Sequence, residues 1–332
     1  MASTTAPPAT RVEAPARLPS QPRAAYVSDL AVDLLRRLGC RYVPLNPGSS
    51  FRGLHDSLVN HGGNQHPQLL LCLHEEIAVS MAHAYAKATG EVAVAAVHDL
   101  VGLMHASMAV YDAWCDRAPL LLLGGGGPAA TGARRPIDWL HSAAVQAQLV
   151  RAYTKWDDEP ADAQGLLDSL ARGHLLAATA PPGPVYVTLD ADLQEQALPL
   201  GLTVPEERLL RAAPGPGGDP DQVTAAARLL VEADAPVVVG GRVGLDPAAT
   251  PALVALCELL AAAYRDDRNT VAFPTDHPHN LTGEPDLLGQ ADAVLAVDLP
   301  DLRSVWRVHS TRDRAGEGDA SRARRLAAIT LE

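Results

Sequence analysis

The chain has 332 residues, 47% of them hydrophobic but only 4% aromatic, which predicts two domains with cores of Ala, Val and Leu. This composition is typical of helices that pack on a mostly buried parallel sheet. The formal net charge of −12 excludes a nucleic-acid-binding surface, because such a surface needs clustered Lys and Arg.

Residues 1–23 are rich in Ala, Pro, Ser and Thr and are predicted to form a disordered tail. They contain no apolar signal core, and no apolar stretch approaches the ~20 residues of a membrane span. The four cysteines are scattered, and no two have the spacing of a metal site or a redox motif. We therefore expect a cytoplasmic protein that does not contact a membrane.

Strand-like and helix-like runs alternate over residues 24–200, which predicts an α/β domain with an open, mainly parallel sheet flanked by helices. The predicted strands are 42–45, 69–73, 92–97, 120–123 and 185–190. The predicted helices are 27–39, 53–59, 74–90, 103–115 and 165–179. The glycines at 124–127 lack the spacing of a phosphate loop, so we expect them to form a flexible exit from the strand before them.

Residues 201–221 include a run rich in Pro and Gly that predicts a linker. A second alternation over 222–332 predicts a smaller, Rossmann-like domain, also α/β and mainly parallel, that is short at its C-terminus. Its predicted strands are 236–241, a weak one near 270–273, 293–299 and 327–332, and its predicted helices are 222–232 and 250–262.

Glu75 stands out because it comes directly after the apolar strand 69–73, at the start of the next helix. The carboxyl ends of strands in open α/β sheets are where ligands bind. A carboxylate in the first turn of a helix also has a purely structural explanation, since it interacts favourably with the helix dipole. Position alone therefore leaves both interpretations of Glu75 open.

The segment LHEEIAVSMAHAYAKATG (73–90) resembles the His-Glu-x-x-Ala…Ala-x-Gly-Tyr-Ala-Arg-x-Thr-Gly segment of thiamine-diphosphate-dependent enzymes of the acetolactate synthase and benzoylformate decarboxylase type. Ala84 replaces the usual glycine. The resemblance implies that residues 24–200 form the pyrimidine-binding domain, that 222–332 form the middle domain, and that Glu75 is the cofactor glutamate. Such a glutamate bonds to N1′ of the aminopyrimidine and favours the tautomer that removes the thiazolium C2 proton. We expect burial to raise the pKa of Glu75.

Neighbouring segments carry the same resemblance. VPLNPGSS (43–50) retains Pro47 and Gly48 of the family's Phe-Gly-x-Pro-Gly turn, where glycine lets the backbone approach the cofactor ring. In HDLVGLMHASMAVYDAWCDRAPLLLLGG (98–125), Gly102 falls on the second glycine of Gly-Pro-Gly-Ala-Thr-Asn, and His105 falls on the Asn. The resemblance thus implies that Glu75, Pro47, Gly48 and Gly102 bind the cofactor.

His98 and Asp99 stand where the family has small residues. Because histidine titrates near neutrality, His98 and His105 are candidate catalytic acid/base groups that face the substrate. The structural alternative is that these side chains bond to one another or cap a helix beginning at 103. His74 is expected to orient the turn, and His141 is a weaker candidate for the site.

The family's third domain holds Mg²⁺ and the diphosphate through Gly-Asp-Gly and a later Asn-Asn, and Gly-Asp-Gly does not occur in these 332 residues. We therefore expect no metal ligands here, and a heteromer in which a second subunit carries the diphosphate- and Mg²⁺-binding domain. Truncation, or loss of catalysis, would also account for the missing motif.

The leading interpretation is a thiamine-diphosphate-dependent subunit that decarboxylates or ligates 2-keto acids together with that partner. The alternative is a non-catalytic regulatory or structural subunit of a full-length thiamine enzyme. We do not expect FAD, although some relatives bind FAD or ADP in the middle domain. A nucleotide-binding α/β protein is disfavoured because VVVGGRVG (237–244) does not have the dinucleotide glycine spacing.

Overall fold

The computed structural model describes residues 13–15, 23–206, 212, 215, 217–246, 248–267, 272–303, 305 and 325–329. The chain divides into two compact units, with the boundary between residues 213 and 214. Most of the predicted disordered tail (1–23) and much of the predicted linker (201–221) lie outside the described residues.

The first unit contains a six-stranded sheet in which every pairing is parallel, in the order β2-β1-β3-β4-β6-β5. Its strands are β1 (Tyr42–Leu45), β2 (Gln68–Leu71), β3 (Ala93–Val97), β4 (Leu120–Gly126), β5 (Asp157–Asp158) and β6 (Pro184–Asp190). The apolar runs of the sequence predict five of these strands, which confirms the α/β fold with an open parallel sheet.

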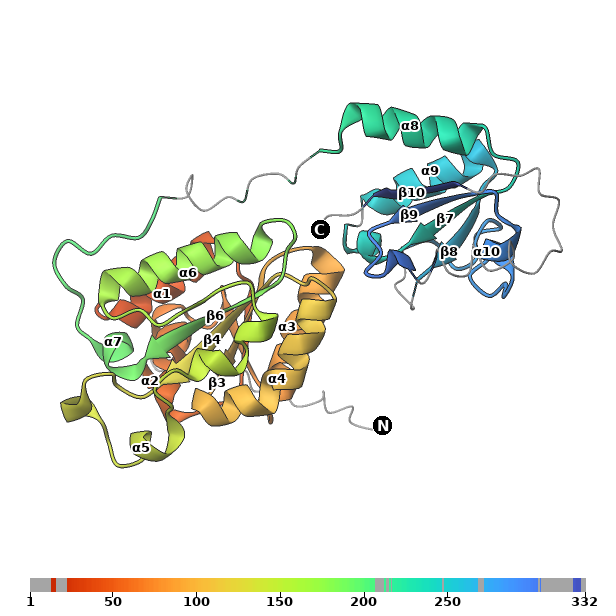
Figure 1. The fold of residues 1–332 in the computed structure, drawn as a ribbon. Helices are drawn as coiled ribbons and strands as arrows, with labels where there is room; N and C mark the ends of the chain where they lie inside the picture. Colours follow the sequence, from red (N-terminus) through yellow and green to blue (C-terminus); the bar gives the residue numbers. More distant parts are fainter. Residues whose placement is uncertain are drawn as a thin grey trace, which may run out of the picture. The chain divides into compact units, whose positions relative to one another are not determined.

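The helices of this unit are α1 (Val27–Arg37), α2 (Arg52–Asp56), α3 (Glu75–Thr89), α4 (Asp99–Cys115), α5 (Asp138–His141), α6 (Ala163–Ala178) and α7 (Ala191–Glu195). Short helical turns are η1 (Ser49–Phe51), η2 (Ser57–His61), η3 (Thr131–Ala133), η4 (Gln146–Leu149) and η5 (Arg151–Tyr153). Helices α1 and α6 cover one face of the sheet, and α3 and α4 cover the other (Figure 1).

The two faces follow from the alternation of side chains along each strand. In β3, Val94 and Ala96 pack with α1 and α6, whereas Ala95 and Val97 pack with α3 and α4. All five β3 residues are buried, as expected for a central strand that is covered on both sides.

Two predictions for this unit are wrong in a way that affects the site. Helix α4 begins at Asp99 instead of 103, so His98 is its N-cap residue and Asp99 lies in its first turn. Gly124–Gly126 do not form a flexible exit, because they continue β4 and pair with β6. A Cβ atom on Gly124 would lie 1.7 Å from the hydroxyl of Tyr186, so close packing explains this glycine.

The second unit has a four-stranded parallel sheet in the order β10-β9-β7-β8. Its elements are α8 (Pro220–Val231), β7 (Pro236–Gly240), η7 (Arg242–Leu245), α9 (Ala249–Leu260), β8 (Ala263–Asp266), α10 (Leu287–Gln290), β9 (Ala293–Val297) and β10 (Arg325–Ile329). The weak strand expected near 270–273 is misplaced: the strand lies at 263–266, and residues 268–271 are outside the described part.

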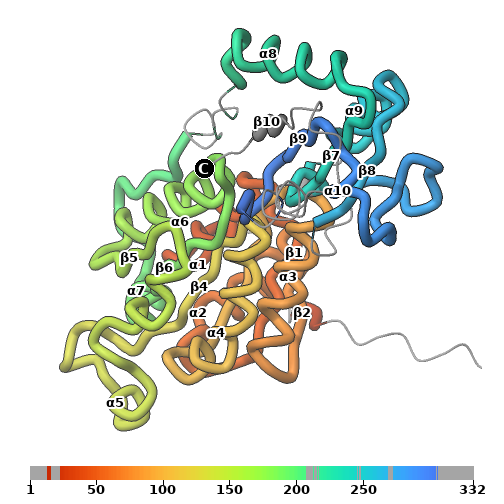
Figure 2. Tube along the Cα trace, turned by 45° about the vertical axis from the view of Figure 1, so that its right-hand side comes forward, coloured from red at the N-terminus to blue at the C-terminus, as the bar shows by residue number. Residues whose placement is uncertain are grey.

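In the first unit, the segments that follow the strands, with α2, α5 and α7, gather at the end of the sheet where the strands end (Figures 1 and 2). Carboxyl ends of parallel strands are the usual ligand-binding edge of such a sheet. Within the described residues, no helix combines the length and the apolar character needed to cross a lipid bilayer.

Candidate active site

Glu75 is the first residue of α3, four residues after the end of β2. Its side chain is buried, whereas the next residue, Glu76, is exposed. Placement at the helix start gives the carboxylate the helix dipole as a favourable neighbour. Burial of a carboxylate is uncommon and requires compensating partners, so the contacts of Glu75 decide how it is used.

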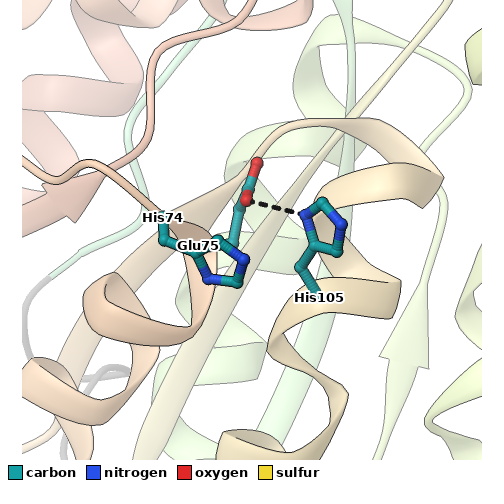
Figure 3. Close-up of side chains that lie close together, drawn as sticks. All are labelled: His74, Glu75 and His105. Atoms are coloured by element: carbon teal, nitrogen blue, oxygen red, sulfur yellow. Dashed lines mark hydrogen bonds and ion pairs between the residues drawn. The ribbon is translucent and has the colours of Figure 1, made fainter.

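Those partners come from α4 and from the loop after β1. His105 Nδ1 lies 3.3 Å from Glu75 Oε2, and the two side chains face each other between α3 and α4 (Figure 3). The other oxygen lies against Gly102: a Cβ atom there would be 2.9 Å from Oε1 and from Cγ of Glu75. Gly102 is therefore needed for the approach of the two helices at the carboxylate.

The expected direction of the Glu75 pKa shift is wrong. Burial does raise the pKa of this carboxyl, but hydrogen bonds from Asn46, from the backbone and from His105, with the charge of His105, together lower the pKa below its ordinary value. Glu75 is thus held as an anion at neutral pH. A buried anion with hydrogen-bond donors around it is suited to pair with a protonated or proton-sharing nitrogen.

His74 supports this arrangement from the turn before α3. Its ring stacks on that of His105, with 4.8 Å between the centroids (Figure 3). Its Nδ1 accepts a hydrogen bond of 3.2 Å from the backbone N–H of Glu76, which satisfies one of the free donors at the helix start. His74 therefore orients the turn, as the sequence predicts.

The loop after β1 brings Pro47 and Gly48 to the same edge of the sheet. Pro47 is exposed, whereas Gly48 lies against His98: a Cβ atom on Gly48 would be 2.1 Å from Cγ of that ring. The requirement for glycine at 48 thus comes from the histidine at the end of β3.

A second polar cluster surrounds His98. The ligand atoms of His98, Asp99 and His141 all lie within 4.8 Å of one another, and Ser50 Oγ lies 2.8 Å from His98 Nδ1. The rings of His98 and His141 meet edge to face at 5.4 Å. His141 reaches this position from α5, 43 residues further along the chain than His98.

The two titratable groups at the start of α4 shift in ways that favour their neutral forms. Burial and then the charge of Asp138 raise the pKa of Asp99 to about 7, although Arg135 acts in the opposite direction. Burial, followed by the charge of His141, lowers the pKa of His98, although the charge of Glu75 acts in the opposite direction. His98 is therefore a neutral imidazole at neutral pH, able to accept a proton.

The predicted site residues thus form two neighbouring groups. Glu75, Gly102 and His105 meet in one, and Gly48 and His98 meet in the other. Sequence reasoning missed Asn46 and Ser50, which flank the Pro-Gly turn after β1. Their polar side chains beside that turn were the available signal, because the turn lies at the ligand-binding edge of the sheet.

Residues 26–148 match the family model described as thiamine pyrophosphate enzyme, N-terminal TPP binding domain. Over these residues the N-terminal unit is similar to the TPP-binding domain of thiamine pyrophosphate enzymes. The chain is similar to the large subunit of acetolactate synthase isozyme 3 of Escherichia coli (strain K12), with 32% identity over 219 residues, or 64% of this chain and 36% of that protein. It is also similar to benzoylformate decarboxylase of Pseudomonas aeruginosa, with 27% identity over 85% of this chain and 53% of that protein.

A solved structure agrees with these relatives of the thiamine pyrophosphate enzyme family. The thiamine diphosphate-dependent 4-hydroxybenzoylformate decarboxylase of Rhodococcus jostii RHA1 matches with a TM-score of 0.70 and 27% identity, over 83% of this chain and 52% of that chain. The present chain spans between about a third and a half of the length of the curated relatives it matches.

The second unit's glycine pair, Gly240 and Gly241, has a packing explanation. A Cβ atom on Gly241 would lie 2.1 Å from the backbone oxygen of Asp298, so the turn after β7 must pass close to the end of β9. The neighbouring Arg242 lies 3.6 Å from the Asp298 carboxylate. These contacts account for the glycines without a phosphate ligand.

Proposed function

We propose that the first unit supplies the aminopyrimidine-binding half of a thiamine diphosphate site in an enzyme that decarboxylates or ligates 2-keto acids. One observation carries the proposal: a buried, ionised carboxylate, Glu75, lies at the ligand-binding edge of a domain that is similar to the TPP-binding domain of thiamine pyrophosphate enzymes. An exposed carboxylate at the helix start would interact with the helix dipole without the cost of burial, so the burial of Glu75 supports a functional role.

The residues around Glu75 fit the cofactor's aminopyrimidine. Glu75 would accept a hydrogen bond from N1′. The turn at Pro47 and Gly48 and the backbone of Gly102 place no side chain over the carboxylate. When bound, the cofactor supplies a carbon nucleophile for the keto carbonyl. The protein's part is to hold a proton-accepting oxygen in a fixed position and to keep water away from it.

His98 and His105 are the proposed acid/base groups. Burial lowers the pKa of His98, which keeps its imidazole neutral and ready to take a proton at neutral pH. The side chain of His105 is about half exposed, at 51%, while its Nδ1 contacts Glu75, so it can exchange protons between solvent and the buried carboxylate. The name of the benzoylformate decarboxylase relative supports 2-keto acids such as an arylglyoxylate as the substrate class.

The proposal includes a second polypeptide that holds Mg²⁺ and the diphosphate. Large apolar side chains are exposed on α3, on α4 and on the turn before α3, next to Glu75. This α3/α4 surface consists of Leu73, Ile77, Met81, Val101, Met104, Met108, Tyr111 and Trp114. Clustered apolar side chains at a protein surface are typical of a protein–protein interface.

The alternative is a non-catalytic subunit of a full-length thiamine enzyme, which the same apolar surface would also serve. The two functions differ in what they require of Glu75. A scaffold needs only the surface, whereas an active half-site needs the carboxylate.

The test is titration calorimetry of the chain with thiamine diphosphate and Mg²⁺, first alone and then with a polypeptide that carries the diphosphate- and Mg²⁺-binding domain. We expect weak binding and no 2-keto acid turnover by the chain alone, because most of the cofactor's charge is on the diphosphate. We expect tight binding and turnover with the partner, since a ligand that binds only the complex stabilises it. Tight binding or turnover by the lone chain would contradict the two-polypeptide site. Turnover that survives Glu75→Gln would favour the non-catalytic subunit.

A further inference from the structure

The cluster of His98, Asp99 and His141 combines two imidazoles and one carboxylate. Their ligand atoms lie within 4.8 Å of one another, although the residues come from the end of β3, the start of α4 and α5. Two imidazoles and a carboxylate are a common ligand set for Zn²⁺ and related divalent ions. Small side-chain movements would bring all three atoms to a single ion.

Asp99 supplies an independent sign of a missing ligand. Its side chain is 2% exposed, and within the described residues its Oδ1 atom is buried with no hydrogen-bond partner. The other oxygen, Oδ2, is 3.5 Å from His98 Nδ1, which is too long for a good hydrogen bond. A buried carboxylate oxygen without a partner is costly and needs an explanation such as an ion or a water molecule.

The backbone at Asp99 adds to this evidence. Its φ angle is +48°, in the left-handed region that non-glycine residues seldom adopt. Strained backbone of this kind persists where the surrounding structure fixes a side chain for function. Here the strain places a carboxylate in the first turn of α4, facing the two histidines.

The charges around the cluster favour a cation. Arg135 is the positive side chain that acts on Asp99, but its guanidinium is bound by both oxygens of Asp138, at 2.8 Å and 3.2 Å. Among the described residues, Asp99 forms no ion pair with Lys or Arg, and its carboxylate lies 3.5 Å from His98 Nδ1. An ion at the cluster would therefore meet a carboxylate whose charge is not already compensated.

We propose that His98, Asp99 and His141 bind a divalent transition-metal ion, with Zn²⁺ as the best match. Mg²⁺ fits poorly because it requires mainly oxygen ligands. Three protein ligands leave a coordination position open, as in catalytic rather than structural zinc sites. The hydroxyl of Ser50, 2.8 Å from His98 Nδ1, provides a further oxygen beside the ion or a hydrogen bond that orients the ring.

This site shares His98 with the proposed cofactor function, but it is measurable without cofactor or substrate. It has one consequence for that function: while the ion is bound, His98 is not available as a free base. Metal loading and proton transfer by His98 are alternatives for the same side chain.

A second histidine–carboxylate group, His74, Glu75 and His105, provides the internal control. There the carboxylate is already hydrogen-bonded by Asn46 and His105, so it lacks the unpartnered oxygen that marks Asp99. The two groups share no residue, and variants can distinguish them.

The experiment uses the full chain after dialysis against a chelator. Zn²⁺ binding is measured by titration calorimetry, and Co²⁺ binding is measured by its visible absorption, which reports the coordination geometry. We expect one saturable equivalent, a higher melting temperature with Zn²⁺, and nitrogen–oxygen coordination of Co²⁺. In His141→Ala and Asp99→Asn, the affinity for Zn²⁺ should fall by more than the roughly 10–100-fold that results when a residue that only hydrogen-bonds to a metal ligand is removed. His105→Ala should bind as the wild type does.

Absence of saturable binding in the wild-type chain would overturn the proposal. So would loss of binding in His105→Ala with retention in His141→Ala, because that result places the ion at the other group. Asp99→Asn keeps the shape of the side chain, so it tests the site even if His141→Ala does not fold.

Discussion

The side chains of Glu75 and His105, 30 positions apart in sequence, meet between the consecutive helices α3 and α4, with His105 Nδ1 3.3 Å from Glu75 Oε2. This contact engages one carboxylate oxygen, while the other oxygen lies against Gly102. Together with Asn46, His105 lowers the pKa of a carboxyl that burial alone would raise. The loop after β1, through Asn46, and helix α4, through His105, therefore both favour the ionised form of the residue on α3.

Glu75→Gln should leave the fold intact but reduce turnover of the reconstituted enzyme by about 10²–10⁴-fold, because the amide cannot accept a shared proton. Steady-state kinetics with the partner polypeptide, alongside circular dichroism of the chain, measures this. Glu76→Gln is the matched control, since Glu76 is the adjacent, exposed residue. If Glu75→Gln and Glu76→Gln reduce turnover equally, Glu75 has no catalytic role that its exposed neighbour lacks.

Gly102→Ala should lower cofactor affinity and turnover without weakening α4. The added Cβ atom would lie 2.9 Å from Glu75 Oε1, so the carboxylate must move. Alanine itself favours a helix over glycine by about 1 kcal/mol, so the helix is not destabilised. Gly132→Ala is the control because Gly132 is exposed with open space at its Cβ position. A Gly102→Ala variant with wild-type affinity for thiamine diphosphate would contradict this account.

His105→Ala should shift the acid limb of cofactor binding to higher pH. His105 stabilises the ionised form of Glu75, so its removal raises the pKa of the carboxyl toward or above its ordinary value. Affinity for thiamine diphosphate, measured from pH 4 to 8 with the partner present, should then begin to fall at a higher pH than in the wild type. His83→Ala, which removes a ring that contacts Asp116, should not move this limb. If cofactor affinity begins to fall at the same pH in His105→Ala as in the wild type, His105 does not influence the charge of Glu75.

His98→Ala should change the pH dependence or the product ratio of the reconstituted enzyme, assayed in buffer that contains Mg²⁺ but no transition-metal ion. Exchange of the cofactor's C2 proton should continue, because that step depends on Glu75. Hydrogen–deuterium exchange at C2 and product analysis measure the two effects separately. If the folded fraction of His98→Ala retains full activity with an unchanged product ratio, His98 is structural, packed against Gly48.

His174, on α6, should make the first unit less stable in mild acid. Burial lowers the pKa of this histidine to about 4, and within the described residues its Nδ1 is a buried atom with no hydrogen-bond partner. In the unfolded chain the histidine has a pKa near 6.5 and binds the proton more readily than in the folded chain. The contribution of neutral His174 to the free energy of unfolding is therefore intact above about pH 6.5 and is lost as the pH falls toward 4. The loss should be roughly 1–3 kcal/mol in the free energy of unfolding. Urea unfolding at pH 7.5 and pH 5 should show a smaller difference for His174→Leu than for the wild type, and equal differences would contradict the assignment.

Local sequence patterns were sufficient for the main elements of both units. Apolar runs such as 92–97 and 293–299 predict the central strands because strands buried on both faces need continuous apolar residues. The position of Glu75 at a strand-to-helix turn was also predictable, since it depends only on where one element ends and the next begins. The start of α4 was not, because Asp99 adopts a left-handed conformation that nothing in its neighbours predicts.

The sequence by itself therefore determined the central strands and the long helices, and it placed Glu75, Gly48, Gly102, His98 and His105 at the ligand-binding edge of the first sheet. Only the tertiary structure decided which of these side chains touch. It paired Glu75 with His105 and Asn46 and so reversed the expected pKa shift, and it brought His141 from α5 to His98 and Asp99. The physical reason is that strand order and helix packing set distances between residues that are 29 or more positions apart, and the sign of a buried charge's pKa shift depends on those distances.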